Sequence, residues 1–207
     1  KRKRWRTDMV WLAAAALLGG ILYGLSGLQL APVSLLTQNS QLVLYALMFL
    51  VGISVGLNKD VLRRIRSYQL RVLVIPAGVV AGSLAGGLVC SLITGLPVNQ
   101  GTAIASGLGW YSLSGVMLTE MAGAHLGSIT FLSNLLREIL SFFSIPWVSR
   151  HLNFYTCIAP AGATSEDTTL PMMIRYTNEE TVVLSVFNGV LCSALVPFLI
   201  RACYRFL

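Results

Sequence analysis

The sequence of 207 residues is 55% hydrophobic and only 11% charged, with a mean hydropathy of +0.73. Soluble domains usually carry about 25% charged residues, so this chain has too little polar surface to cover a water-exposed globule. Its net charge of +7 does not indicate a nucleic-acid partner, because most basic residues lie in two short blocks instead of covering one face. Composition therefore predicts an all-α integral membrane protein embedded in a lipid bilayer.

Five apolar runs are long enough to cross a bilayer core, which takes about 20 helical residues. They are predicted at residues 9–31, 40–57, 72–96, 126–148 and 181–200, within a single membrane domain of residues 1–207. The two basic blocks, residues 1–6 and 59–71, flank the first two runs. Under the positive-inside rule they predict a cytoplasmic N-terminus, and five spans then leave the C-terminus on the outer side.

Residues 101–120, with the sequence GTAIASGLGWYSLSGVMLTE, are apolar but unusually rich in glycine and serine. Non-helical backbone survives at membrane depth only where it is buried in protein or lines a wet cavity. We therefore predict a broken or re-entrant segment whose cavity lining includes Trp110, Tyr111, Ser112 and Ser114. The alternative for the two aromatic residues is a place in the interfacial belt.

A second broken segment is predicted at residues 155–172, where IAPAGATSEDTTLP is bracketed by Pro160 and Pro171 with Gly162 between them. Proline at both ends argues against one continuous helix. Each broken segment precedes a span, and the two units enter from opposite sides. Such units are typical of secondary transporters, whose sites lie where broken segments meet. No residue-level repeat is visible between the two units, so the inverted symmetry is a hypothesis.

Three polar residues, Asn134, Arg137 and Glu138, interrupt the fourth span. Such residues cost free energy at the centre of a bilayer unless they face the bundle interior. Glu138 is therefore a candidate ligand for a cation or a proton, with an interhelical salt bridge as the alternative. Its neighbour Arg137 points about 100° away on a helix, so the two are not an obvious pair.

The second broken segment carries two adjacent acids, Glu166 and Asp167. Adjacent carboxylates repel each other unless a cation lies near, which suits a site that alternately holds a cationic substrate and a proton. The alternative is a capping cluster in which Thr164 or Ser165 caps a helix. Glu120, at the end of the first broken segment, completes the acidic candidates.

Enzyme chemistry is not predicted. The two histidines and four cysteines lack metal-ligand spacing, and neither a GxSxG elbow nor a Walker-type phosphate loop occurs. We expect no metal and no cofactor. Active transport would then use an ion gradient, with protons as the default coupling ion.

Three separated blocks carry a resemblance to a known family. They are ASGLGWYSLSGVMLTE at 105–120, FLSNLLREIL at 131–140 and PAGATSEDTTLP at 160–171, and they resemble the bacterial lysine exporter family LysO in content and order. The resemblance implies an exporter of L-lysine, and of toxic analogues such as thialysine, in the bacterial inner membrane. The span count above then puts the C-terminus on the periplasmic or extracellular side. The resemblance places the family's intramembrane acidic residues on Glu138 and Asp167.

The resemblance covers the C-terminal two-thirds of the usual family length, because family members carry further spans before the matched region. A separate small membrane subunit would supply those spans if this chain is the large subunit of a split version. The alternative is a homo-oligomer of the present chain.

The mechanism that these residues suggest is lysine/proton antiport. Glu138 and Asp167 would hold the ammonium groups, with hydroxyls and backbone of the broken segments on the α-carboxylate. The rival functions are a cation-selective channel and a non-transporting membrane scaffold in which the acids are structural ion-pair members.

Overall fold

The computed structural model describes residues 73–207 and eight isolated residues nearer the N-terminus. The chain divides into two compact units, Lys1–Leu50 and Val51–Leu207, and all the elements below belong to the second. The predicted spans at 9–31 and 40–57 and the basic block at 59–71 lie almost wholly outside the described residues, so they remain predictions.

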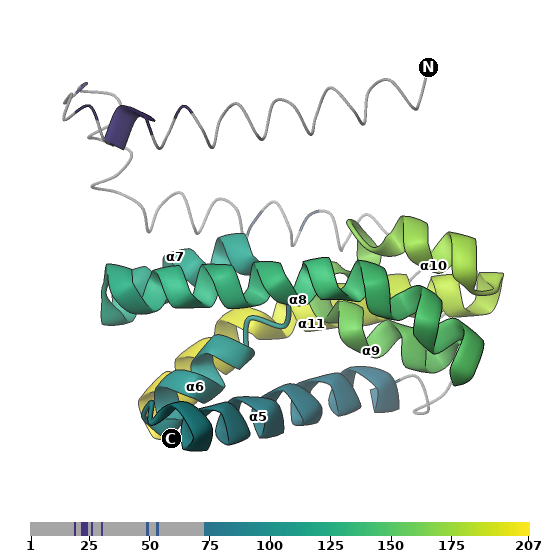
Figure 1. Cartoon of the computed structure of the whole chain (residues 1–207), viewed down its shortest axis with the longest axis horizontal. Helices are drawn as coiled ribbons and strands as arrows, with labels where there is room; N and C mark the ends of the chain where they lie inside the picture. Colours follow the sequence, from purple (N-terminus) through teal and green to yellow (C-terminus); the bar gives the residue numbers. More distant parts are fainter. Residues whose placement is uncertain are drawn as a thin grey trace. The chain divides into compact units, whose positions relative to one another are not determined.

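Three long helices form the frame of the second unit (Figure 1). They are α5 (Val74–Thr94), α8 (Ala124–His151) and α11 (Glu179–Phe206). Each is long and apolar enough to cross a membrane, and each begins within two residues of a predicted span. The all-α class is confirmed, since the described chain from residue 73 onward contains helices and their connections without a strand.

Both predicted broken segments contain short helices separated by a break. In the first, α6 (Val98–Ala105) and α7 (Tyr111–Ala122) are separated by residues 106–110, which we call the first break. The second contains η2 (Tyr155–Cys157), α9 (Ile158–Ala161), η3 (Gly162–Glu166) and α10 (Leu170–Tyr176). We call residues 162–169, which include η3, the second break.

The long helices alternate in direction, with α8 running opposite to α5 and α11 (Figure 1). Each broken segment folds back between them, so that α6 packs on α5 and α7 packs on α8. At one end of α11, the Nδ2 atom of Asn99 donates to the carbonyl of Tyr204 at 3.2 Å. At its other end, the hydroxyl of Tyr155 donates to Oε1 of Glu180 at 3.1 Å. The last span is thus bonded at its two ends to different broken segments.

Helix α8 has two unlike faces. Its exposed large side chains are Leu132, Leu136, Ile139, Leu140, Phe143 and Trp147, and its buried residues include Thr130, Asn134, Glu138, Ser141 and Ile145. The spacing of three and four residues within each set puts each on its own side of the helix. An apolar outer face and a polar inner face are what a helix between lipid and a bundle interior requires.

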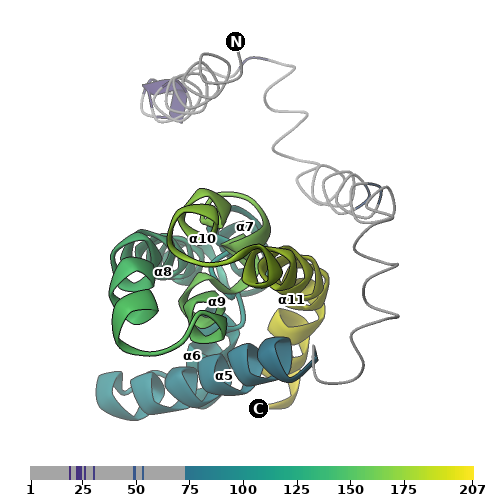
Figure 2. The same ribbon diagram turned by 90° about the vertical axis from the view of Figure 1, so that its right-hand side faces the viewer.

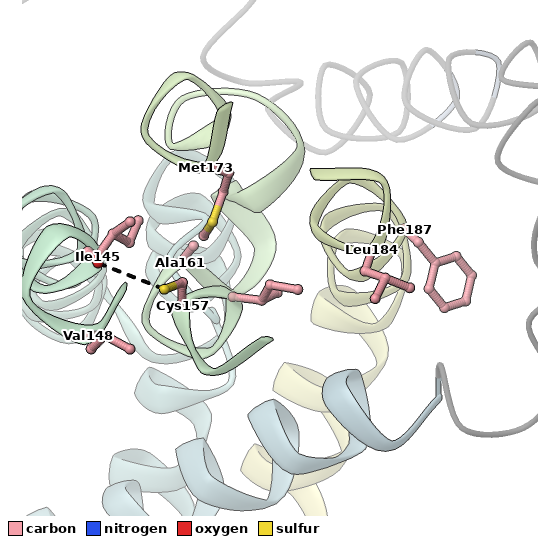
Figure 3. Packing of buried hydrophobic residues seen from close by; sticks show 8 residues of the cluster. Ile145, Val148, Cys157, Ala161, Met173, Leu184 and Phe187 are labelled. Atoms are coloured by element: carbon pink, nitrogen blue, oxygen red, sulfur yellow. Dashed lines mark hydrogen bonds between the residues drawn. The ribbon is translucent and has the colours of Figure 1, made fainter. Parts of the chain in front are cut away.

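A cluster of buried apolar side chains holds the second broken segment between α8 and α11 (Figure 3). Its members are Ile145, Val148, Cys157, Ile158, Ala161, Met173, Leu184 and Phe187. In the end-on view, α9 lies between α8 and α11 (Figure 2). Close packing of this kind, more than exclusion of water, holds helices together in a bilayer, so the cluster fixes where the second break lies.

Small residues let α5 and α6 approach closely. A Cβ atom on Gly87 would lie 2.7 Å from the carbonyl oxygen of Gly101, which leaves no room for a side chain there. The other glycines of this helix, Gly78, Gly82 and Gly86, would meet nothing within 4 Å. One glycine of α5 therefore makes a helix contact inside the second unit, in the manner of small-residue interfaces in membranes.

Candidate functional site

The two breaks cross each other, backbone against backbone. The amide of Ala163 in the second break donates to the carbonyl of Leu108 in the first at 2.9 Å. A Cβ atom on Gly162 would lie 2.3 Å from that same carbonyl oxygen, so the contact requires glycine. Gly162 has a φ of 59° and Leu108 a φ of 50°. Left-handed backbone costs a leucine about 1–2 kcal/mol, and the fully buried Leu108 side chain must be held there by its packing.

Asn134 of α8 holds the first break in place. Its Oδ1 accepts from the amide of Gly109 at 2.8 Å, and its Nδ2 donates to the carbonyl of Ile104 at 3.0 Å. A Cβ on Gly107 would lie 2.6 Å from the same Nδ2 atom. The side chain is almost fully buried, and it satisfies backbone groups that the interrupted helix leaves without partners.

Asn188 of α11 does the same for the second break. Its Nδ2 donates to the carbonyl of Gly162 at 2.9 Å and to the hydroxyl of Ser165 at 3.0 Å. Ser165 and Ser185 also exchange bonds, each hydroxyl donating to the other's carbonyl, at 2.8 and 2.6 Å. All three polar side chains are fully buried, so the second break is tied to α11 by hydrogen bonds as well as by packing.

Arg137 lies on the other side of the second break. Its Nε and Nη2 atoms donate to the carbonyls of Pro160 and Ala159 at 3.3 and 3.4 Å, and its Nη1 donates to Ser83 of α5 at 2.8 Å. A cation beside the last carbonyls of a helix is favourable. The guanidinium thus connects α8, α9 and α5 instead of pairing with Glu138, its neighbour in sequence.

Glu138 is the buried acid of the site. It is 6% exposed, and its Oε2 atom has no hydrogen-bond partner among the residues that the structure describes. The side chain of Thr168 lies close enough to interact with this carboxyl, and the charge of Asp167 also acts on it. No ion pair joins Glu138 to any described residue, so the salt-bridge alternative finds no partner there. A buried carboxylate without a cation is costly.

Asp167 and Tyr111 complete this group of side chains. The two carboxylates of the site both act electrostatically on the phenol of Tyr111, which begins α7 immediately after the first break. Asp167 is exposed, and its Oδ1 accepts from the amide and hydroxyl of Thr168. Tyr111, Glu138, Asp167 and Thr168 therefore lie within electrostatic range of one another, and we call these four residues the acidic cluster.

Glu166 points away from the acidic cluster although it precedes Asp167. A Cβ on Gly189 of α11 would lie 2.6 Å from the Cβ of Glu166, and the hydroxyl of Ser193 donates to its Oε1 at 3.1 Å. The alternative reading of this stretch as a capping cluster is not found, since Thr169 occupies the N-cap of α10 without a side-chain bond. Thr164 instead donates to the carbonyl of Ala161 at 2.9 Å.

The remaining predicted site residues lie around the first break and along α7. Trp110 is half-buried at the N-cap of α7, and Ser112 is exposed. Ser114 is buried, and its hydroxyl donates a hydrogen bond to the carbonyl of Trp110 at 2.8 Å. Glu120 is exposed near the far end of α7, about 13 Å along the helix from Tyr111 at 1.5 Å per residue. The structure does not bring Glu120 to the acidic cluster, whereas the hydroxyl of Ser114 lies 3.5 Å from the carbonyl oxygen of Tyr111.

Two polar residues at the crossing have contacts that the sequence did not predict, although Arg137 was named among the polar residues of the fourth span. Asn188 and Arg137 each bond backbone of the second break or of the helix before it. The available signal was that both lie inside predicted spans, where a polar group must find a partner. The sequence did not show that the partner would be the backbone of an interrupted helix.

Comparisons with known proteins agree with one another. The sequence profile of the family described as lysine exporter LysO matches residues 14–204. The chain is 40% identical over 181 residues to lysine exporter LysO of Escherichia coli (strain K12), covering 87% of this chain and 59% of that protein. It is 37% identical over 158 residues to a putative lysine exporter of Haemophilus influenzae, covering 76% of this chain and 80% of that protein. No solved structure matches the chain.

Proposed function

The chain belongs to the lysine exporter LysO family, and from that premise we propose that it exports L-lysine across the bacterial inner membrane. It spans 59% of the length of its Escherichia coli relative. We propose that export also requires the spans that correspond to the remaining part of that relative, whether they belong to the same polypeptide, to a small partner subunit or to a second copy of this chain.

The observation that carries the proposal is the buried carboxylate of Glu138 beside the exposed carboxylate of Asp167. Lysine carries two ammonium groups, and an ammonium group is the partner that Oε2 of Glu138 lacks among the described residues. Asp167 is open to the surroundings, so it receives the substrate first and Glu138 holds it at depth. Thialysine keeps both ammonium groups and is expected to follow the same route.

The coupling that fits this site is exchange of lysine for protons. When lysine leaves on the outer side, protons bind to the two carboxylates. The neutral, empty site then returns to the cytoplasmic side without placing an unpaired negative charge in the bilayer. The carbonyl and amide groups of the two breaks lie beside the acidic cluster, as at the interrupted helices of other secondary transporters. In this arrangement both broken segments are re-entrant, and they enter from opposite faces of the membrane.

The test is uptake of labelled lysine into liposomes preloaded with unlabelled lysine. The chain is reconstituted with the N-terminal part of the Escherichia coli relative supplied as a separate chain, with and without a proton gradient. We expect saturable exchange that the gradient stimulates, and a loss of at least about 100-fold for Glu138→Gln, as for removal of a buried charge partner. Asp167→Asn should also lose exchange, because it removes the second carboxylate that the two ammonium groups need. Glu179→Gln, at an exposed carboxylate that begins α11, is the matched control and should exchange normally.

Each of the other outcomes favours one of the alternative functions or removes the two carboxylates from the mechanism. Flux that does not saturate and ignores the gradient would identify a cation-selective channel. Normal exchange in both cluster variants would remove the carboxylates from the mechanism. Loss of folded protein in parallel with loss of exchange would identify them as structural members of a scaffold.

A further inference from the structure

The spans after the two breaks place one asparagine each at matching positions. Asn188 follows Asn134 by 54 positions, and both side chains are buried. The side-chain amide of each forms a hydrogen bond with the backbone of the break that precedes its span. The breaks show the same offset independently. Leu108 and Gly162, also 54 positions apart, have left-handed φ angles of 50° and 59° at the crossing, and Gly109, next to Leu108, has a φ of 98°.

A contact between the two breaks agrees with this register. Leu108 meets Gly162 directly, since a Cβ on Gly162 would lie 2.3 Å from the Leu108 carbonyl oxygen. Two copies of a unit related by a twofold axis touch at that axis through equivalent residues. The contact between positions that the offset makes equivalent is therefore what such an axis at the crossing would produce.

The spans themselves also match. Helices α8 and α11 are each 28 residues long, and they run in opposite directions (Figure 1). Their first residues, Ala124 and Glu179, differ by one position from the same offset, which is within the usual uncertainty of a helix end. The packing is reciprocal as well, since α6, which precedes α8, contacts α11, and α9, which precedes α11, contacts α8.

We propose that residues 98–151 and 152–205 are two inverted repeats with an offset of 54 positions, and that Asn134 and Asn188 are their equivalent positioning residues. Each asparagine holds the break of its own repeat at the crossing, next to the acidic cluster. The role in transport rests on the proposed function of lysine export, whereas the repeat itself does not.

The repeat is symmetric in its backbone and not in its charges. The offset pairs Glu138 with Cys192, a fully buried thiol, and it pairs Asp167 with Leu113. Each repeat therefore contributes one carboxylate from a different place in its own fold. The positioning residues are duplicated, while the groups that contact the cation are single.

An experimental structure of the full chain in a lipid disc tests the repeat without any transport measurement. Superposing residues 98–151 on 152–205 should require a rotation near 180° about an axis in the membrane plane, and should bring Asn134 onto Asn188. A rotation that leaves the two asparagines on different turns of their helices would overturn the repeat. This outcome is independent of whether the chain exports lysine.

Lysine exchange in liposomes tests the positioning role, with Asn134→Ala and Asn188→Ala as the variants. We expect each to raise the half-saturating lysine concentration by about 10-fold, the effect of one lost buried hydrogen bond. Asn178→Ala is the control, because Asn178 caps the start of α11 by accepting from Thr181 at 2.9 Å, away from both breaks. That variant should lower the melting temperature and leave the half-saturating concentration unchanged.

Two results would overturn the positioning role. One is a fall in maximal rate that only follows the amount of folded protein in both asparagine variants. The other is a raised half-saturating concentration at one asparagine alone. Absence of lysine exchange by the unaltered chain and its partner spans would instead refute the proposed function, and with it the role in transport, while the superposition would still decide the repeat.

Discussion

The two breaks have similar backbones and different side chains. The first, residues 106–110, reads SGLGW and carries no charge, whereas the second, residues 162–169, reads GATSEDTT. Each contains a residue with left-handed backbone and is held by an asparagine of the span that follows. The comparison separates two tasks: both breaks supply the crossing, but only the second adds acidic side chains to it.

The largest effect should come from the residue that makes the crossing possible. Gly162→Ala adds a Cβ where the Leu108 carbonyl already lies and places alanine at a φ of 59°. We expect a loss of at least about 3 kcal/mol from clash and left-handed strain together, seen as a large drop in melting temperature and in lysine exchange. Gly82→Ala on α5, where a Cβ meets nothing within 4 Å, should change stability by less than about 1 kcal/mol. Equal effects at the two glycines would mean that the breaks do not touch.

A smaller effect is expected where the second break has a support that the first lacks. Arg137→Leu removes the guanidinium bonds to the Pro160 and Ala159 carbonyls and to Ser83. The expected cost is about 2 kcal/mol in thermal unfolding, since hydrogen bonds from a charged donor exceed neutral ones. Arg137→Lys keeps the charge but not the fork of donors, so it should fall between leucine and the unaltered chain. A melting temperature that is unchanged in Arg137→Leu would show that α9 does not need the cation.

The smallest effect should distinguish the two adjacent acids of the second break. Glu166→Gln keeps an oxygen that accepts from Ser193, so we expect a stability change below about 1 kcal/mol and lysine exchange within about twofold of normal. The comparison variant is Asp167→Asn, which should abolish exchange. If Glu166→Gln also abolishes it, then the carboxylate that faces α11 belongs to the transport site.

Pattern alone predicted the three long apolar helices of the described chain, because an apolar run of that length has few other uses. It also located both broken segments, since glycine in the first and paired prolines in the second argue against continuous helices. The roles of Asn188 and Arg137 could not be predicted, because their partners are backbone carbonyls. Every residue has a backbone carbonyl, so the sequence does not indicate which one accepts the hydrogen bond. Glu166 and Asp167 look equivalent as neighbours, and only the three-dimensional turn after η3 sends them to different partners.

Because backbone contacts cannot be recognised from residue types, the amino-acid sequence also did not reveal the repeat. The offset of 54 pairs Leu108 with Gly162 and Glu138 with Cys192, residues that share a position and no chemistry. Five pairs are identical at this offset, namely Asn99 with Asn153, Thr102 with Thr156, Ile104 with Ile158, Ala105 with Ala159 and Asn134 with Asn188. Five identities in 54 positions are too few to recognise as a repeat. Backbone angles and hydrogen bonds therefore reveal a similarity that side-chain identity hides.

The bonds at the two ends of α11 have a mechanical consequence. The helix is about 42 Å long at 1.5 Å per residue, with Tyr204 bonded to Asn99 before α6 ends and Glu180 bonded to Tyr155 before α9 begins. Because the same helix is bonded at both ends, a tilt of α11 about its middle would displace its two ends in opposite directions. A movement of one broken segment would then be accompanied by an opposite movement of the other.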